Sequence, residues 1–243
     1  MKIVAIIQAR MGSSRLPGKA LKDINGRSML ARVVRRAGRS SLIDRVVVAT
    51  TDKKSDDAIV NECKNIGISV FRGSEDDVLD RYYQAARAFY AEGVVRITSD
   101  CPLVDPGIID LVIQAFLDHD VDYASNTLEG TYPRGLDVEV FTFDALQRAW
   151  NKATEAFEHV HVTPYIYLHP EQFKVLSVTS DEKLVGYRWT VDTQEDLNLI
   201  RTIYEKMDDD DYFSWRDVMG LFEDEPNLAE INRHIRQKSL EEC

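Results

Sequence analysis

Short apolar runs rich in β-branched residues alternate along this chain with longer amphipathic segments. The first run, residues 3–8 (IVAIIQ), lacks the polar alternation of a half-exposed strand and is typical of a strand buried on both faces. By the same reasoning, further strands are expected at 45–50, 68–71, 94–98, 121–126, 137–142, 173–178 and 187–191. Helices are expected at 28–39, 56–66, 77–91, 107–118, 143–153 and 193–207, the last with Thr193 as its N-cap, and again from 214 onward. Because parallel strands need helical crossovers, this order predicts an α/β fold with three α/β/α layers and a mostly parallel sheet.

The length of the chain and its lack of interruptions favour a single domain. The 243 residues can bury one sizeable core, and they contain no internal repeat, low-complexity segment or linker. We expect one domain over 1–243, with an excursion at about 125–170 where strands and helices alternate less regularly. The N-terminal apolar run is too short for a signal peptide, and no run approaches the roughly 20 residues of a membrane span. These features predict a cytoplasmic protein that has no membrane partner.

Three scattered cysteines give no sign of a disulfide framework. Cys63, Cys101 and Cys243 form no CxxC pair. In the cytosol such thiols stay reduced, and we interpret Cys101 as a small buried side chain.

The charge of the chain is unevenly distributed. The net charge of −11 argues against a nucleic-acid-binding surface, which requires a basic stripe. Residues 1–50 nevertheless carry eleven Lys and Arg against two Asp and Glu, which indicates a local anion site. Four of these cations are expected instead on a solvated helix face: Arg32, Arg35, Arg36 and Arg39. The acidic run 208–211 (DDDD) is likewise interpreted as a solvated turn and not as a metal site.

Polar and charged clusters follow the expected strands. Ligands of open parallel sheets bind beyond the carboxyl ends of the strands. The loops at 9–19, 51–55, 72–76 and 99–105 should therefore share one edge, and they hold most of the Gly, Pro, Ser and charged clusters. We expect the functional site at this edge.

The segment 8–19 (QARMGSSRLPGK) is expected to bind phosphate. Gly12 lets the backbone approach an anion, and successive N–H groups can surround phosphate oxygens. Arg10, Arg15 and Lys19 supply charge-assisted donors, and three cations on one short loop repel each other unless an anion lies between them. The order of residues differs from the P-loop and from the GxGxxG of dinucleotide folds, which disfavours NAD. A solvated basic loop is the alternative.

Seven segments together resemble the cytidylyltransferases that make CMP-activated sugar acids. The first is IIQARMGSSRLPGKAL, and the others follow in the order of that family: VVVATTD (46–52), VFRGSEDDVLDRYYQAA (70–86), VRITSDCPLVDP (95–106), GLDVEVF (135–141), HVTPYI (161–166) and RWTVDTQEDL (188–197). The pattern is most similar to the spore-coat-polysaccharide branch, which is related to the CMP-Kdo and CMP-sialic acid synthetases. This resemblance implies a Rossmann-like nucleotidyltransferase fold, CTP as the nucleotide and a homodimer formed through the excursion. It also implies that the nucleotide contacts Gln8, Arg10, Gly12, Ser13, Arg15, Lys19 and Asp100.

Asp100 and Asp192 are the candidate metal ligands. Asp100 follows the strand expected at 94–98, and a carboxylate at a strand's end can hold Mg²⁺ while leaving positions for phosphate and water. Asp192 directly precedes an expected helix, where a carboxylate that only stabilises the helix N-terminus is the alternative. The resemblance implies that both aspartates bind Mg²⁺, although the family often has Gly where this chain has Ser99.

Arg72 and Ser74 lie at an expected junction between a strand and a helix. The resemblance implies that they contact the base or ribose of the nucleotide. Two structural alternatives are open, since Ser74 with Asp77 fits an S-x-x-D helix start and Asp80 with Arg81 could form a surface ion pair.

The acceptor substrate is expected to contact Tyr132, Arg134, Asp137 and His161. Tyr132 offers an aromatic face and Arg134 a carboxylate clamp, although the related branch more often has an acidic or small residue at the latter position. His161 belongs to a stretch that resembles the family's EHVTP, with Val160 in place of the usual Glu. His159 and His161 would share one face of a strand, but no third ligand of suitable spacing supports a zinc site.

The resulting hypothesis is in-line attack of an acceptor oxygen on the α-phosphorus of CTP, with release of pyrophosphate. Such chemistry needs mainly positioning and charge neutralisation, so the expected catalytic residues are Arg15, Lys19 and Asp100. Arg15 and Lys19 would hold the β,γ-phosphates, Arg10 would orient the nucleotide, and Mg²⁺ would neutralise the α-phosphate. The acceptor is expected to be a small acidic sugar or a related acid. The alternatives are GTP in place of CTP, a nucleotide-sugar-dependent glycosyltransferase with 118–120 (DHD) as its Asp-X-Asp motif, and a catalytically silent nucleotide-binding protein.

Overall fold

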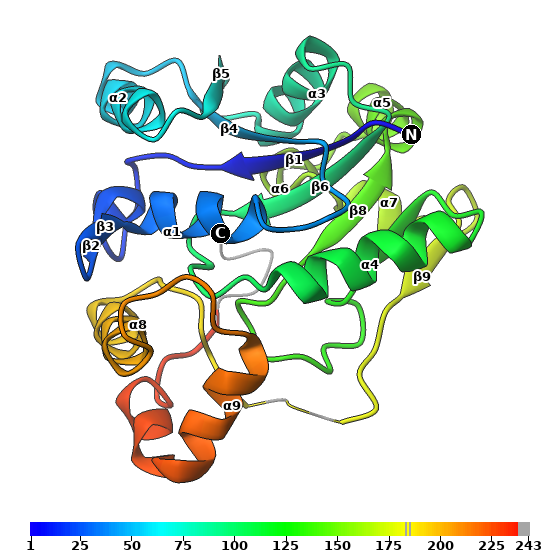
Figure 1. Cartoon of the computed structure of the whole chain (residues 1–243). Helices are drawn as coiled ribbons and strands as arrows, with labels where there is room; N and C mark the ends of the chain where they lie inside the picture. Colours follow the sequence, from blue (N-terminus) through cyan, green and yellow to red (C-terminus); the bar gives the residue numbers. More distant parts are fainter. Residues whose placement is uncertain (183, 185, 238–243) are drawn as a thin grey trace.

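The computed structural model describes residues 1–182, 184 and 186–237, and within them seven strands form one mixed, mostly parallel sheet. The order across this sheet is β5-β4-β1-β6-β8-β7-β9 (Figure 1). The strands are β1 (Ile3–Gln8), β4 (Arg45–Thr51), β5 (Ser69–Gly73), β6 (Gly93–Thr98), β7 (Tyr123–Ser125), β8 (Glu139–Thr142) and β9 (Val175–Ser177). Only β8 is antiparallel to its neighbours, β6 and β7. A short separate hairpin joins β2 (Asp23–Ile24) to β3 (Arg27–Ser28).

Helices cover both faces of the sheet, as Figure 1 shows for α1 and α4 on one side and α3 and α5 on the other. The helices are α1 (Met29–Ala37), α2 (Asp57–Asn65), α3 (Val78–Ala88), α4 (Pro106–Asp118), α5 (Phe143–Lys152), α6 (Ala156–His161), α7 (Pro164–Tyr167), α8 (Gln194–Lys206) and α9 (Trp215–Asp224). Short 3₁₀ turns lie at η1 (Lys19–Leu21), η2 (Lys54–Asp56) and η3 (Pro226–Ile231). Among the described residues, no helix has the length and apolar character needed to cross a membrane.

The central strands are buried on both faces, which explains their continuous apolar runs. In β1, Ile3, Ala5 and Ile7 pack into one buried cluster with α1, α4 and α8, while Val4 and Ile6 pack into a second cluster with α3 and α5. Alternate side chains of a strand point to opposite faces, so one strand contributes to both clusters. The predicted α/β fold with a mostly parallel sheet is confirmed.

The strand assignment at 187–191 is wrong. No strand forms there, and Arg188 makes only an isolated bridge to Arg134. His159 and His161 lie in α6, where two residues so spaced do not share a face. The N-cap predicted for Thr193 is confirmed, because its hydroxyl accepts a hydrogen bond from the backbone of Asp196 at the start of α8.

The arginines expected on a solvated helix face are largely structural. Arg32 and Arg36 of α1 are both fully buried. Nη1 of Arg32 lies 3.1 Å from Oδ1 of Asp211, and Nε of Arg35 lies 2.8 Å from Oδ2 of the same residue. Asp211 itself is only 2% exposed, so the acidic run 208–211 is not uniformly solvated. We call Arg32, Arg35, Arg36 and Asp211 the arginine cluster; it joins α1 to the chain between α8 and α9.

Both described free cysteines, Cys63 and Cys101, are buried. Cys101 is 2% exposed and packs in the larger buried cluster, which confirms its interpretation as a small buried residue. Cys243 lies outside the described residues.

Gly135 allows two loops to approach each other closely. Its φ is +108°, and a Cβ atom at this position would lie 2.7 Å from the carbonyl carbon of Trp189 and 2.8 Å from the nitrogen of Thr190. We expect Gly135→Ala to lower the free energy of unfolding by about 2–4 kcal/mol, because it adds a backbone clash to an unfavourable φ. Urea denaturation measures this loss. Gly130→Ala is the matched control, since its φ is also positive (+59°) but its Cβ would meet open space; equal losses for both variants would contradict the close approach.

Candidate active site

The site lies where the parallel strands β1, β4 and β6 end at one edge of the sheet. Their register aligns Gln8 with Ala49 and with Thr98, so the loops that follow begin side by side. The nitrogen of Ser99, for example, donates to the carbonyl of Gln8 at 3.1 Å. Two adjoining cavities open at this edge, of about 290 Å³ and 570 Å³, and we call them the first and the second cavity.

The first cavity is formed largely by the cationic loop that follows β1. Six residues of this loop that are expected to bind the nucleotide line the cavity: Gln8, Arg10, Gly12, Ser13, Arg15 and Lys19. The expected contact Asp100 lines it as well. The loop closes on itself, because the nitrogen of Gly18 donates to the carbonyl of Met11 at 3.0 Å. Asp56 fixes the loop from outside by accepting the N–H of Met11 at 2.9 Å. The backbone therefore holds the cations of this loop around one cavity.

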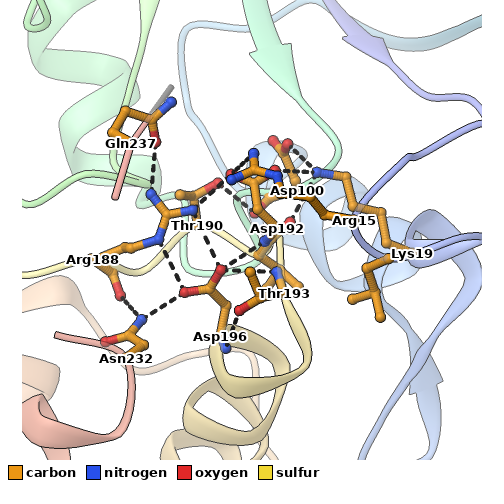
Figure 2. Close-up of polar contacts among 12 residues, drawn as sticks. Arg15, Lys19, Asp100, Arg188, Thr190, Asp192, Thr193, Asp196, Asn232 and Gln237 are labelled. Carbon is orange, nitrogen blue, oxygen red and sulfur yellow. Dashed lines mark hydrogen bonds and ion pairs between the residues drawn. The ribbon is translucent and has the colours of Figure 1, made fainter. Parts of the chain in front are cut away.

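Lys19 lies between the two aspartates predicted to bind metal, as Figure 2 shows. Its Nζ lies 2.7 Å from Oδ2 of Asp100 and 2.8 Å from Oδ1 of Asp192. Nη2 of Arg15 lies 2.9 Å from Oδ2 of Asp192. Burial alone would raise the pKa of Asp100, but the ammonium of Lys19 lowers it to about 2. The two carboxylates also raise the pKa of Lys19 against the effect of its burial, so all three groups are charged at neutral pH.

The paired carboxylates suit a small divalent cation. One oxygen of Asp100 and one of Asp192 contact the same nitrogen of Lys19, so both carboxylates face one point. Carboxylate oxygens are ligands that Mg²⁺ prefers, and it commonly takes only one or two of them from the protein. The described residues contain no group of three His, Cys, Asp or Glu side chains placed to bind a metal, so water and phosphate would have to supply the remaining ligands. The same observation gives no support to a zinc site.

A second pair of charged residues, which sequence reasoning missed, holds Asp192 in place. Nη2 of Arg188 lies 2.7 Å from Oδ2 of Asp192, and its Nε lies 3.0 Å from Oδ1 of Asp196. Asp196 is fully buried and also accepts the backbone N–H groups of Asp192 and Thr193, at 2.9 and 3.0 Å. Thr193 is the N-cap, so Asp192 is not needed for that role and its side chain faces the site. The available signal was the four-residue spacing of opposite charges at 188, 192 and 196.

Arg81 is another missed residue of the first cavity. It is 2% exposed, donates through Nη1 to the carbonyl of Ser74, and lines the cavity. Within the described part of the chain, its Nε and Oε1 of Gln8 are buried without a hydrogen-bond partner. The alternative of a surface ion pair between Asp80 and Arg81 is therefore excluded, since Arg81 is buried and Asp80 instead accepts from Nε1 of Trp150 at 3.0 Å.

The structure does not bring Arg72 or Ser74 into either cavity. Nε of Arg72 donates to the carbonyl of Thr51 at 2.9 Å, and its Nη1 lies 2.6 Å from Oδ1 of Asp57. Ser74 accepts from the nitrogen of Asp77 at 3.0 Å, and Asp77 is the residue that caps α3. Both predicted nucleotide contacts thus have local structural partners.

The second cavity contains three of the four residues expected to bind the acceptor. Arg134, Asp137 and His161 line it, and His161 lines the first cavity as well. Tyr132 does not line the cavity. Its ring packs edge-on against that of Trp215, with 6.1 Å between the ring centroids. Burial raises the pKa of Asp137 despite the nearby charge of Arg134.

Several further residues that line the second cavity were not predicted, among them Arg96, Glu139, Thr163 and Gln237. Oε1 of Glu139 accepts from Tyr123 at 2.7 Å and from Thr163 at 2.5 Å, and Oε2 forms an ion pair with Arg96. Glu139 is therefore held by hydrogen bonds on both of its oxygens. His159, by contrast, points away from this group, because its Nδ1 lies 2.9 Å from Oδ2 of Asp77.

Comparison with known proteins identifies the family. The profile of the cytidylyltransferase family matches residues 4–224. The chain belongs to the cytidylyltransferase family. The family assignment predicted from the seven sequence segments is confirmed.

Individual cytidylyltransferase relatives fit this assignment. The chain is 36% identical to the spore coat polysaccharide biosynthesis protein SpsF of Bacillus subtilis over 234 residues, which cover 93% of this chain and 96% of that protein. It is 41% identical to a 3-deoxy-manno-octulosonate cytidylyltransferase of Trichlorobacter lovleyi over 119 residues, 48% of this chain and 46% of that enzyme. The solved structure of a cytidylyltransferase from Leptospira borgpetersenii matches with a TM-score of 0.90 and 32% identity, covering 98% of this chain and all of that chain.

The residues proposed for a glycosyltransferase lie elsewhere in this cytidylyltransferase fold. Asp118 ends α4 and accepts from Gln114 at 2.8 Å, and Asp120 pairs with Lys174. None of the residues 118–120 lines either of the two cavities. The Asp-X-Asp alternative is therefore not supported by the arrangement of the site.

Proposed function

We propose that the chain transfers CMP from CTP to an acidic sugar or related acid and releases pyrophosphate, with Mg²⁺ held by Asp100 and Asp192. One observation carries this proposal: Lys19 joins the two aspartates at the wall that both cavities share. A phosphate-binding loop and a carboxylate pair at the junction of two cavities are what transfer between two substrates requires.

Each of the two cavities would bind one of the two substrates. The first cavity would take the nucleotide, with Arg15 and Lys19 on the β,γ-phosphates and Arg10 orienting the triphosphate. The second cavity would bind the acceptor, so that one oxygen of the acceptor faces the α-phosphorus of CTP. That oxygen forms a bond to phosphorus as the bond to pyrophosphate breaks in line, and the hydroxyl proton leaves to water. When bound, Mg²⁺ neutralises phosphate charge and lowers the pKa of the attacking hydroxyl.

The nature of the acceptor is proposed from the relatives and the cavity together. One relative is named for 3-deoxy-manno-octulosonate, an acidic sugar, and another for the biosynthesis of a polysaccharide. In this chain, Arg134 on the second cavity can bind a carboxylate, and Asp137 can accept from hydroxyl groups. The homodimer implied by the resemblance and the cytoplasmic location expected from the sequence features stay predictions.

A pyrophosphate-release assay tests the proposal. The purified protein is incubated with Mg²⁺, one of CTP, GTP, UTP or ATP, and a panel of acids that includes 3-deoxy-manno-octulosonate. We expect release only when an acid is present and at least tenfold faster with CTP, and the CMP-linked product is identified by mass spectrometry. A preference for GTP would overturn the choice of nucleotide. A parallel incubation supplies nucleotide sugars in place of the nucleotides, and sugar transfer there, without pyrophosphate release in the first incubation, would overturn nucleotidyl transfer itself.

A further inference from the structure

The segment that follows α9 lies against the site. The match to the family profile ends at residue 224, before this segment, residues 225–237. This segment begins with η3 and continues to Gln237, the last residue that the structure describes. Asn232 is 3% exposed, which indicates that the segment is packed against the protein.

Asn232 attaches this segment to the residues that hold Asp192. Its Nδ2 donates to the carbonyl of Arg188 at 2.9 Å and to Oδ1 of Asp196 at 2.8 Å, as Figure 2 shows. The amide thus contacts both members of a buried ion pair. Removing a partner from such a pair is costly, which favours a fixed position for the segment.

Gln237 extends the same attachment into the second cavity. Its Oε1 accepts from Nη1 of Arg188 at 2.6 Å, and its side chain lines the cavity beside Arg134 and Asp192. A residue from the end of the described chain therefore forms part of the wall expected to face the acceptor.

Arg188 is the junction of this arrangement. Its guanidinium contacts Asp192 and Asp196 at the start of α8 and Gln237 from the segment after α9. The side chain is 10% exposed. A planar guanidinium can make these contacts in fixed directions at once, whereas a lysine ammonium at the same place cannot. The orientation of Asp192 and the position of Gln237 thus depend on one side chain.

We propose that residues 226–237 are part of the active site, with Gln237 a specificity-determining residue for the acceptor and Arg188 a positioning residue for Asp192. The proposal rests on the proposed function, because it takes the second cavity as the acceptor site and Asp192 as a metal ligand. An acceptor that contacts Gln237 is then two hydrogen bonds away from the carboxylate of Asp192.

The first arm of the test measures the acceptor. Gln237→Ala in the full-length protein should raise the KM for the acid with the fastest release in the panel, 3-deoxy-manno-octulosonate being the starting probe. We expect a rise of about threefold to tenfold, the usual effect of losing one hydrogen bond, with the KM for CTP within about twofold of wild type. Arg233→Ala is the matched control, since it lies in the same segment, is exposed and pairs with Glu230. An unchanged acceptor KM, or a fall in kcat and melting temperature alone, would overturn the role of Gln237.

The second arm needs no acceptor. Arg188→Lys keeps the positive charge beside Asp196 but loses the planar guanidinium with its several N–H donors. We therefore expect Mn²⁺ to bind about tenfold more weakly in the presence of CTP, and electron paramagnetic resonance measures this binding. Wild-type Mn²⁺ affinity in Arg188→Lys would overturn the positioning role. Failure of the proposed function gives a different result, because the wild-type protein would then release no pyrophosphate with any nucleotide.

Discussion

Asp100→Asn is expected to reduce pyrophosphate release by about 10²–10³-fold while leaving the fold intact. The asparagine keeps the size of the side chain but removes the charge that faces Lys19 at 2.7 Å. It also removes one of the two oxygen ligands proposed for Mg²⁺. Lys19 keeps its contacts with Asp192 and with the carbonyl of Val191, so the fold should tolerate the change.

Three quantities are measured for the variant and for the wild-type protein: kcat/KM for CTP, the melting temperature and the affinity for Mn²⁺. Asp118→Asn is the control, because it removes a carboxylate from the rival Asp-X-Asp sequence, where Asp118 bonds only to Gln114 in the described structure. We expect wild-type release from this control. Full activity in Asp100→Asn would exclude Asp100 from the catalytic site, and a loss in Asp118→Asn would revive the glycosyltransferase alternative.

Asp211→Ala is expected to lower the free energy of unfolding by about 3–5 kcal/mol, because it leaves the guanidinium of Arg32 buried without its carboxylate. Arg32 is fully buried, and its Cζ lies 4.2 Å from the centroid of the Tyr204 ring, so solvent does not reach the guanidinium. The carbonyl of Ile24, which accepts from Arg32, satisfies a donor but does not neutralise the charge. Arg35 would lose its partner as well, although it is more exposed.

Urea denaturation measures the loss from Asp211→Ala. Asp208→Asn is the control from the same acidic run: this residue is exposed, and asparagine tolerates its φ of +55°. We expect a change within about 0.5 kcal/mol for the control. Equal effects of the two substitutions would show that the arginine cluster does not contribute to stability.

The sequence predicted the layers of the fold because buried strands leave a strong pattern. The run at 3–8 had to be apolar on both faces once helices packed on each side, and this could be read without a structure. The run at 187–191 was misread for a related reason. Trp189 and Val191 are buried and Arg188 and Asp192 face the site, which gives the alternation of a strand, but no neighbouring strand pairs with them.

The site could be predicted only in its local parts. The loop 8–19 carries its own chemistry, so six of its residues were identified and all of them line one cavity. In the sequence, Arg32 and Arg36 have the pattern of a solvent-exposed helix face, because their partner Asp211 is more than 170 residues away in the chain. Gln237 was missed for a similar reason, because its partner Arg188 lies 49 residues earlier in the chain, whereas the partners of Arg188 at 192 and 196 were within reach of a spacing argument. Spacing along a helix identifies which side chains share a face, but it does not identify what that face meets.

The close approach at Gly135 restricts how this site can be altered. The backbone of Arg134 is bonded on both sides to the segment that leads to Asp192, since its nitrogen donates to Tyr187 at 3.1 Å and its carbonyl accepts from Trp189 at 2.7 Å. The acceptor wall and the carboxylate segment therefore form one rigid piece of backbone. The lining of the second cavity can be changed by exchanging the side chains at 134 and 137, whereas moving the loop itself would displace Asp192. Redesign of this cavity for a larger ligand should therefore keep the backbone at 134–137 and shorten the side chains that it carries.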